Sequence, residues 1–504
     1  MDRDLSHALH HFGFRLAIHL PEGAETVTRT DAASAATTGL RVLVFLPVKA
    51  NRRPRPTSGD RELRLWKVGR ALTITFAAAV LVAGGIFYGL VSLLDFQEID
   101  TTKKLDAKTL FDLVKLSFGV VAGAGALVAL VVAYRRQRVD EAGAHREATR
   151  LHTERFSQAV DKLGSDSPAV RLGGVHALAG LADDAPDVNL RQTCIDVLCA
   201  YLRLPHTPDP GTAELENHHL YLALREVRHT ILRLIGDHYR RPEGTHHSWQ
   251  GCDLDLTGVT IDGHMDFSDA RFTRGTVTFS GATFSGGSVD FSGATFSGGW
   301  VDFSGATFSG GRVDFSGATI SGGRVDFSNA TISGGAVFFS NATINGRTVF
   351  FGGATVSGGT VSFGDAMISG GTVYFGDATI SGGAVYFSTA TISGGTVVFS
   401  GATISGGTVF FRDATFSGGV VAFSGATISG GTLDFSSTTI TGGAVFFYGA
   451  TISSDTVSFD GATISGGTLD FSSTTGPAPA GLLTAVGSPA PTTVILSQAW
   501  APIP

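Results

Sequence analysis

The chain has 504 residues, a formal net charge of −7 and three cysteines. Its length predicts more than one domain, and its net charge is too weak to indicate the chemistry of a partner. Three cysteines cannot form the disulfide framework of a small secreted protein, and they are typical of a reducing compartment.

Residues 1–60 are mixed in composition and show no periodicity, and they end in the basic stretch Arg52-Arg-Pro-Arg55-Pro. We expect a largely disordered leader here. A signal peptide is not expected, because the only short apolar run, Val42–Val48, lies too far from the N terminus and is interrupted by Pro47.

Two long apolar runs follow, at residues 71–94 and 116–134. Each is long enough to cross a bilayer, and no comparable apolar segment exists elsewhere to bury them as a pair of core helices. We therefore expect a two-helix transmembrane hairpin in the cell membrane. Arginines flank the pair on both sides, which favours cytoplasmic N- and C-terminal regions, although the loop between the runs also contains lysines.

Each apolar run contains one GxxxG pattern, Gly85–Gly89 and Gly119–Gly123. Small residues four apart let two helix backbones approach closely, but glycine is common in membrane helices in any case. The patterns are compatible with packing of the two helices on each other or with self-association of two chains.

Residues 139–240 have helical patterns. The expected helices are a polar one leaving the membrane, an apolar pair and a fourth helix: Ala144–Leu163, Ala169–Ala182, Asp187–Leu204 and Leu220–Tyr239. The segment 169–182 resembles a HEAT or armadillo-type helix, which implies a small all-α module. Because Gly173-Gly174 is unfavourable in an isolated helix, we expect it to pack closely against the next helix.

A 12-residue phrase dominates residues 251–475. Its leading aromatic recurs every twelve residues from Phe267 to Phe471, in 18 copies, and a shorter copy starts at Leu256. Self-similarity at a fixed period identifies a repeat architecture. The segment also has no Lys and no Glu, only 16 Asp and 6 Arg.

Each copy contains two apolar–polar–apolar triplets, such as Val301-Asp302-Phe303 and Ala306-Thr307-Phe308. Period-two alternation predicts short strands whose apolar residues point inward and whose Asp302 and Thr307 point outward. Ser-Gly and Ser-Gly-Gly separate the strands, and glycine permits the positive φ angles that sharp corners need.

The units Ala294-Thr-Phe296-Ser-Gly and Val301-Asp-Phe303-Ser-Gly resemble the pentapeptide-repeat family. The helical segment before the repeats is similar to that of membrane-anchored actinobacterial members. The resemblance implies a right-handed, four-sided parallel β-solenoid with one unit per side. This chain departs from the family pattern because it inserts two residues, such as Gly299-Trp300, after every second unit.

The short Ser-Gly link predicts the size of a turn. Fully extended it spans at most about 10 Å, so it leaves no slack for reversing the chain between two walls about 10 Å apart. We therefore expect two copies, or 24 residues, in each turn and about nine turns in all. Phe291 should then stack on Phe315, and Phe303 should lie on a different wall.

No pattern indicates a catalytic residue, a cofactor site or a metal site. Cys194 and Cys199 lie five residues apart on an expected helix and share no face well. Cys252 and His264, with His246-His247 before them, match no zinc spacing. The chain has no nucleophile elbow and no phosphate loop, so we expect a protein that is not an enzyme.

Two outward columns supply repeated surface chemistry. With 24 residues per turn, like charges would share a face only two deep, and we expect solvated strand residues instead of an imitation of duplex DNA. The threonine column is one residue wide, which is narrow for ice binding. The columns are Asp290, Asp302, Asp314 and Asp326, and Thr283, Thr295, Thr307, Thr319, Thr331, Thr343 and Thr355.

The sequence predicts a non-enzymatic, membrane-anchored scaffold whose cytoplasmic β-solenoid binds partner proteins. A surface adhesin with the solenoid outside the cell, or a DNA-mimicking binder of a DNA-processing enzyme, are the alternatives. Residues 476–504 are either a disordered tail or a cap on the last coil. The apolar residues available for such a cap are Leu482, Leu483, Val494, Ile495 and Leu496.

Overall fold

The computed structural model describes residues 107–500, except for 206–208, 454–455 and 488–490, together with a few positions between 73 and 85. The predicted leader, 1–60, and almost all of the first apolar run, 71–94, lie outside the described residues. By its contacts the chain divides into two units, residues 1–130 and 131–504.

The first long helix is α3 (Ala107–Leu163). It contains both the second apolar run, 116–134, and the expected helix Ala144–Leu163, which are therefore one element. The intervening residues contain no proline and several arginines, and arginine is a good helix former. In the part of the chain that the structure describes, no helix is long and apolar enough to cross a membrane. The predicted two-helix transmembrane hairpin is thus not observed.

Three further helices pack together after α3. They are α4 (Pro168–Asp183), α5 (Val188–Arg203) and α6 (Leu215–Arg240). Asp187 caps α5, because its carboxylate accepts hydrogen bonds from the backbone N–H groups of Asn189 and Leu190. A Cβ on Gly174 would lie 2.6 Å from the backbone nitrogen of Leu163. The expectation that this glycine packs on the next helix is wrong, since it contacts the preceding one.

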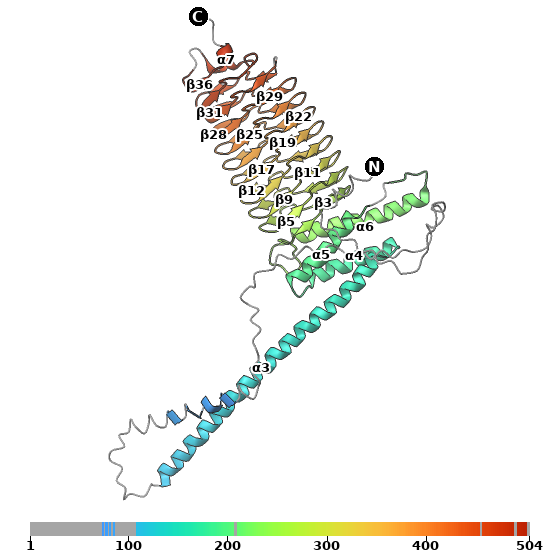
Figure 1. The fold of residues 1–504 in the computed structure, drawn as a ribbon, viewed down its shortest axis with the longest axis vertical. Helices are drawn as coiled ribbons and strands as arrows, with labels where there is room; N and C mark the ends of the chain where they lie inside the picture. Colours follow the sequence, from blue (N-terminus) through green and yellow to red (C-terminus); the bar gives the residue numbers. More distant parts are fainter. Residues whose placement is uncertain are drawn as a thin grey trace, which may run out of the picture. The chain divides into compact units, whose positions relative to one another are not determined.

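Residues 254–495 form a parallel β-solenoid of the right-handed type with four walls (Figure 1). We number the walls in chain order. Wall I contains β2 (Thr260–Ile261), β6 (Thr283–Phe284), β10 (Thr307–Phe308), β14 (Thr331–Ile332), β18 (Thr355–Val356), β22 (Thr379–Ile380), β26 (Thr403–Ile404), β29 (Thr427–Ile428) and β32 (Thr451–Ile452). Wall II contains β3 (His264–Asp266), β7 (Ser288–Asp290), β11 (Arg312–Asp314), β15 (Ala336–Phe338), β19 (Thr360–Ser362), β23 (Ala384–Tyr386), β27 (Thr408–Phe410), β30 (Thr432–Asp434) and β33 (Val457–Ser458).

Walls III and IV join into one 18-stranded sheet, because β28 and β31 each run unbroken around the corner between them. Wall III contains β4 (Arg271–Phe272), β8 (Thr295–Phe296), β12 (Thr319–Ile320), β16 (Thr343–Ile344), β20 (Met367–Ile368), β24 (Thr391–Ile392), the first part of β28 (Thr415–Ala422) and of β31 (Thr439–Phe446), and β34 (Thr463–Ile464). Wall IV contains β1 (Leu254–Asp255), β5 (Thr276–Thr278), β9 (Trp300–Asp302), β13 (Arg324–Asp326), β17 (Thr348–Phe350), β21 (Thr372–Tyr374), β25 (Thr396–Val398), the second part of β28 and β31, β35 (Thr468–Asp470) and β36 (Val494–Ile495).

The register confirms that one turn takes 24 residues. Thr307 pairs with Thr331, and the rings of Phe291 and Phe315 stack with centroids 4.8 Å apart and an interplanar angle of 5°. Phe303 lies on another wall and meets Phe291 edge-on, with centroids 6.3 Å apart. The leading phenylalanines of opposite walls thus fill the width of the solenoid between them.

The predicted inward and outward residues are also confirmed. Val301, Phe303 and Phe308 are fully buried, whereas Asp302 and Thr307 are half-buried on the outer surface. Alternation places them so, because successive side chains of a strand point to opposite faces.

The two kinds of corner use glycine for different reasons. At the Ser-Gly corner, Gly305 has φ +65°, and the N–H of Ala306 donates to the carbonyl of Phe303 at 3.0 Å, as in a type II turn. At the Ser-Gly-Gly corner, a Cβ on Gly311 would lie 2.6 Å from the Cβ of Phe284 in the preceding coil. Gly311 is therefore required by the close approach of two coils, and positive φ is not its role.

The helical module closes the first end of the solenoid (Figure 1). Tyr239 of α6 packs edge-on against Phe267, with centroids 5.4 Å apart, and Arg203 of α5 pairs with Asp255 of β1 at 2.5 Å. A Cβ on Gly236 would lie 2.5 Å from the carbonyl oxygen of Asp266. One hydrophobic core consequently runs from the helices through the coils.

Residues after 475 cover the opposite end. They include α7 (Leu482–Val486) and a 3-10 helix, η2 (Gln498–Trp500). Leu482 is fully buried, and β36 pairs with β35 of the last coil. The Trp500 ring lies 5.3 Å from that of Phe471. Of the apolar residues considered for a cap, Leu483 and Ile495 are exposed.

Candidate functional site

The outward aspartates stack along two opposite walls. Asp290 pairs in register with Asp314 on wall II, and Asp302 pairs with Asp326 on wall IV. Asp266 extends the wall II column by one coil, which the sequence analysis did not include. The columns are thus two or three carboxylates deep before the outward residue changes.

These carboxylates are engaged in local structure. Asp302 accepts a hydrogen bond from the backbone N–H of Ser304 at 2.8 Å, and Asp314 accepts one from that of Ser316 at 2.9 Å. Such side-chain turns satisfy a backbone donor at the corner. Burial raises the pKa of Asp314, but the hydrogen bonds from Ser316 and Arg312 outweigh burial, and the net shift is downward.

Arginines in the same strands neutralise part of each column. Arg312 pairs with Asp314, and Arg324 pairs with Asp326 at 2.5 Å. Compensated charges at every coil or two differ from the unbroken charge of duplex DNA, about one per 1.7 Å. The geometry therefore gives no support to imitation of DNA.

Aromatic residues take the place of aspartate farther along both walls. On wall IV, Asp326 is followed in register by Phe350, then by Tyr374 and Val398. We call the outward positions from residue 350 to residue 446 on this wall the aromatic band. The five strands that carry it contain no charged residue, and its outward members are Phe350, Tyr374, Val398, Ala422 and Phe446.

Wall II carries a shorter aromatic series. Phe338 follows Asp314 in register, and Tyr386 stacks on Phe410 with ring centroids 5.1 Å apart. Aromatic residues are enriched at protein–protein interfaces. Sequence analysis missed both series, although reading the residue between the inward Val and Phe at every twelfth position would have found them.

An arginine joins the charged part of wall IV to the aromatic band. The guanidinium of Arg324 lies 5.3 Å from the ring centroid of Trp300 and 4.3 Å from that of Phe350, a geometry that favours cation–π attraction. A hollow of about 320 Å³ opens beside these three residues. Trp300 is 38% exposed, so an aromatic surface is accessible at this border.

The threonine columns occupy walls I and III. Thr283, Thr307 and Thr331 stack in register on wall I, and Thr295 and Thr319 stack on wall III. Each strand contributes one outward threonine, so each row is one residue wide. The structure does not bring the two rows onto one surface.

The cysteines and histidines do not assemble into a site. Burial raises the pKa of Cys194 and of Cys199 to about 12, and it also raises that of Cys252. These thiols are consequently protonated at neutral pH. Over the described residues, no group of three or more His, Cys, Asp or Glu side chains has a geometry that could hold a metal ion.

The geometry defines a repeat protein with a buried aromatic core and patterned outer walls. Residues 274–319 and 286–331 match the family model of pentapeptide repeats (9 copies). The β-solenoid therefore belongs to the pentapeptide-repeat family, and the resemblance seen in the sequence is confirmed. Comparisons with curated proteins and with solved structures gave no match.

Proposed function

We propose that this protein is a non-enzymatic scaffold and that its β-solenoid binds a partner protein through the aromatic band of wall IV. The observation that carries the proposal is the change of outward residue at one structural position, from Asp302 and Asp326 to Phe350 and Tyr374. The fold does not require the change, because aspartate and aromatic residues occupy the same register.

The dimensions of the band fit a protein partner. Five strands at about 4.8 Å spacing give a surface on the order of 20 Å long. Threonine, valine and alanine lie beside the outward aromatic residues, so the surface is uncharged over this length. Uncharged aromatic surfaces of this kind mark sites of protein interaction.

The test uses substitutions that the repeat already contains. Phe350→Asp and Tyr374→Asp place in the band the residue that Asp326 supplies one coil earlier. The double variant should keep the far-UV circular dichroism of the wild type and lose the captured partner in affinity capture from solubilised membranes. Thr355→Ser on wall I is the control and should retain it. Equal capture by the double variant would show that the band is not the binding surface.

We further propose that residues 71–94 and 116–134 anchor the chain in the cell membrane, with the solenoid in the cytoplasm. Their apolar length supports this, as does the exposure of Leu127 and Leu130 in α3, 56% and 67%. The full chain should stay in the membrane pellet after carbonate washing, and deletion of residues 61–138 should release it. Recovery of the full chain in the wash would contradict the anchor.

Topology distinguishes the cytoplasmic scaffold from a surface adhesin. A reporter enzyme fused after residue 475 should be active when it requires the cytoplasm. Activity only outside the cytoplasm would favour the adhesin, and it would leave the binding role of the aromatic band to be tested against extracellular partners.

A further inference from the structure

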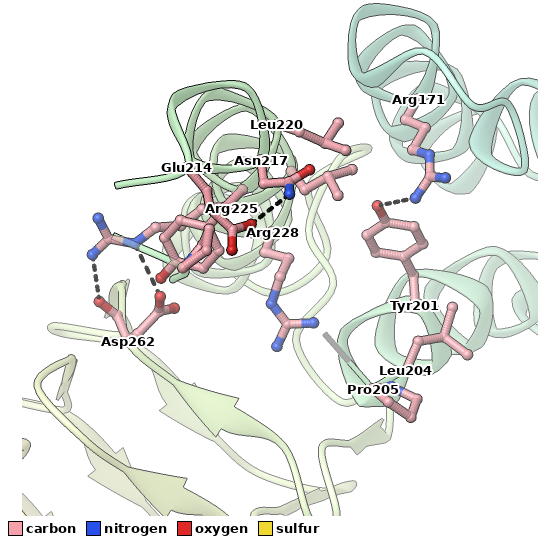
Figure 2. A pocket seen from close by; sticks show the side chains of 13 residues that line it. Arg171, Tyr201, Leu204, Pro205, Glu214, Asn217, Leu220, Arg225, Arg228 and Asp262 are labelled. Carbon is pink, nitrogen blue, oxygen red and sulfur yellow. Dashed lines mark hydrogen bonds and ion pairs between the residues drawn. The ribbon is translucent and has the colours of Figure 1, made fainter. Parts of the chain in front are cut away.

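A hollow of about 420 Å³ lies between the helical module and the first coil of the solenoid (Figure 2). Its lining includes Arg171 of α4, Tyr201 of α5, Arg228 of α6 and Asp262, which follows β2. Pockets that bind small molecules have volumes from about 300 Å³ upward, so the hollow suits a small ligand. It shares no residue with the aromatic band.

Arg228 is a buried cation at this hollow. The residue is 6% exposed, and it donates to the carbonyl oxygens of Leu202 at 2.8 Å and of Thr260 at 3.2 Å. Both acceptors are neutral, and within the described residues no carboxylate lies within ion-pair distance of Arg228. Burial lowers its pKa, against the opposing effect of Asp262. A buried charge without a paired opposite charge is costly, and a bound anion would offset that cost.

The neighbouring charges leave this cation uncompensated. Asp262 is shared by Arg225 at 3.0 Å and His229 at 3.2 Å. Arg171 donates to the hydroxyl of Tyr201 at 3.3 Å, and it forms no ion pair with a carboxylate of the described residues. Figure 2 shows Arg228 extending from α6 into the space beside Tyr201, with Arg171 on the far side of that tyrosine. Two guanidinium groups therefore border the hollow without a carboxylate partner.

The remaining walls are apolar. Leu204 and Leu220 line the hollow and are 54% and 47% exposed, and Leu224 and Pro205 continue the apolar surface. Guanidinium groups match carboxylate geometry well, and exposed leucines favour contact with hydrocarbon. The lining thus combines a cationic end with an apolar wall.

We propose that this hollow binds a small amphipathic carboxylate, whose head contacts Arg228 and Arg171 and whose apolar body lies along Leu220 and Leu224. Arg228 would otherwise serve only to tie the end of α5 to β2, a role indifferent to any ligand. The two roles predict different binding behaviour, which a charge-matched set of probes resolves.

The experiment is equilibrium dialysis of the full chain in a nonionic detergent against octanoate, with octanol and inorganic phosphate as comparison probes. The wild type should bind octanoate saturably and should bind octanol and phosphate at least tenfold more weakly. Arg228→Gln and Arg171→Gln should each weaken octanoate binding at least tenfold. Arg233→Gln, an equal charge change at an exposed position of α6, should leave binding unchanged.

Several results would overturn the proposal. Equal binding of octanol would show simple apolar partition, and equal binding of phosphate would show that the apolar wall is not used. Unchanged octanoate binding by Arg228→Gln or by Arg171→Gln would refute the head-group assignment. Should Arg228→Gln fail to fold, as judged by circular dichroism, Arg171→Gln carries the test, because Arg171 is only half-buried.

Discussion

The aromatic core makes a quantitative prediction for Phe303→Ala. The Phe303 ring is fully buried and stacked between Phe279 at 4.9 Å and Phe327 at 4.7 Å. It also meets Phe291 and Phe315 edge-on, with both centroid distances 6.3 Å. Removal of a buried phenylalanine side chain costs about 3–5 kcal/mol. We expect the upper half of that range, because the strand ladders fix the flanking rings and prevent the cavity from closing.

Hydrogen exchange followed by mass spectrometry is the suitable assay, because a repeat array need not unfold in one step. A loss of about 4 kcal/mol should reduce protection of the coils around Phe303 by about three orders of magnitude, while the coil around Phe435 should change far less. Thr307→Ala is the matched control on the outer surface, and it should cost no more than about 0.5 kcal/mol. Equal losses for both variants, or a loss below about 1 kcal/mol for Phe303→Ala, would refute the assigned packing.

Three further substitutions test other features of the structure. Gly311→Ala should destabilise its coil by about 2 kcal/mol or more, because the new Cβ would lie 2.9 Å from a carbonyl oxygen of the preceding coil; wild-type hydrogen exchange there would contradict the close approach. Thr389→Gly should stabilise by about 1 kcal/mol, since a β-branched residue is held at φ +59°, and a lower denaturation midpoint would exclude this strain. For Asp262, hydrogen bonds from His229 and Arg225 outweigh burial and lower the pKa below its model value of 3.8, so its contribution is present above about pH 4 and is lost as pH falls further. Asp262→Asn should therefore lower stability to urea at pH 7 and have a smaller effect at pH 3, and an equal effect at both would refute the linkage.

The local pattern determined most of the solenoid. Val301, Phe303 and Phe308 alternate with polar residues at period two, and this alternation alone places them inward. The two-residue link at Ser304-Gly305 is too short to reverse the chain, so the sequence also gives 24 residues per turn. The outward change from Asp326 to Phe350 is written in the sequence at twelve-residue spacing, and it was missed because the column was followed through only four copies.

Only the tertiary structure decided how the separate elements meet. Nothing local to α6 indicates that Gly236 lies against Asp266 or that Tyr239 packs on Phe267. The hollow at Arg228 likewise depends on helices and a solenoid corner that are distant in the chain. Periodicity reports which face of an element is apolar, but which apolar faces cover one another depends on packing between segments far apart in sequence. The walls of the solenoid could therefore be derived from the repeat, whereas its caps and the hollow beside the first cap could not.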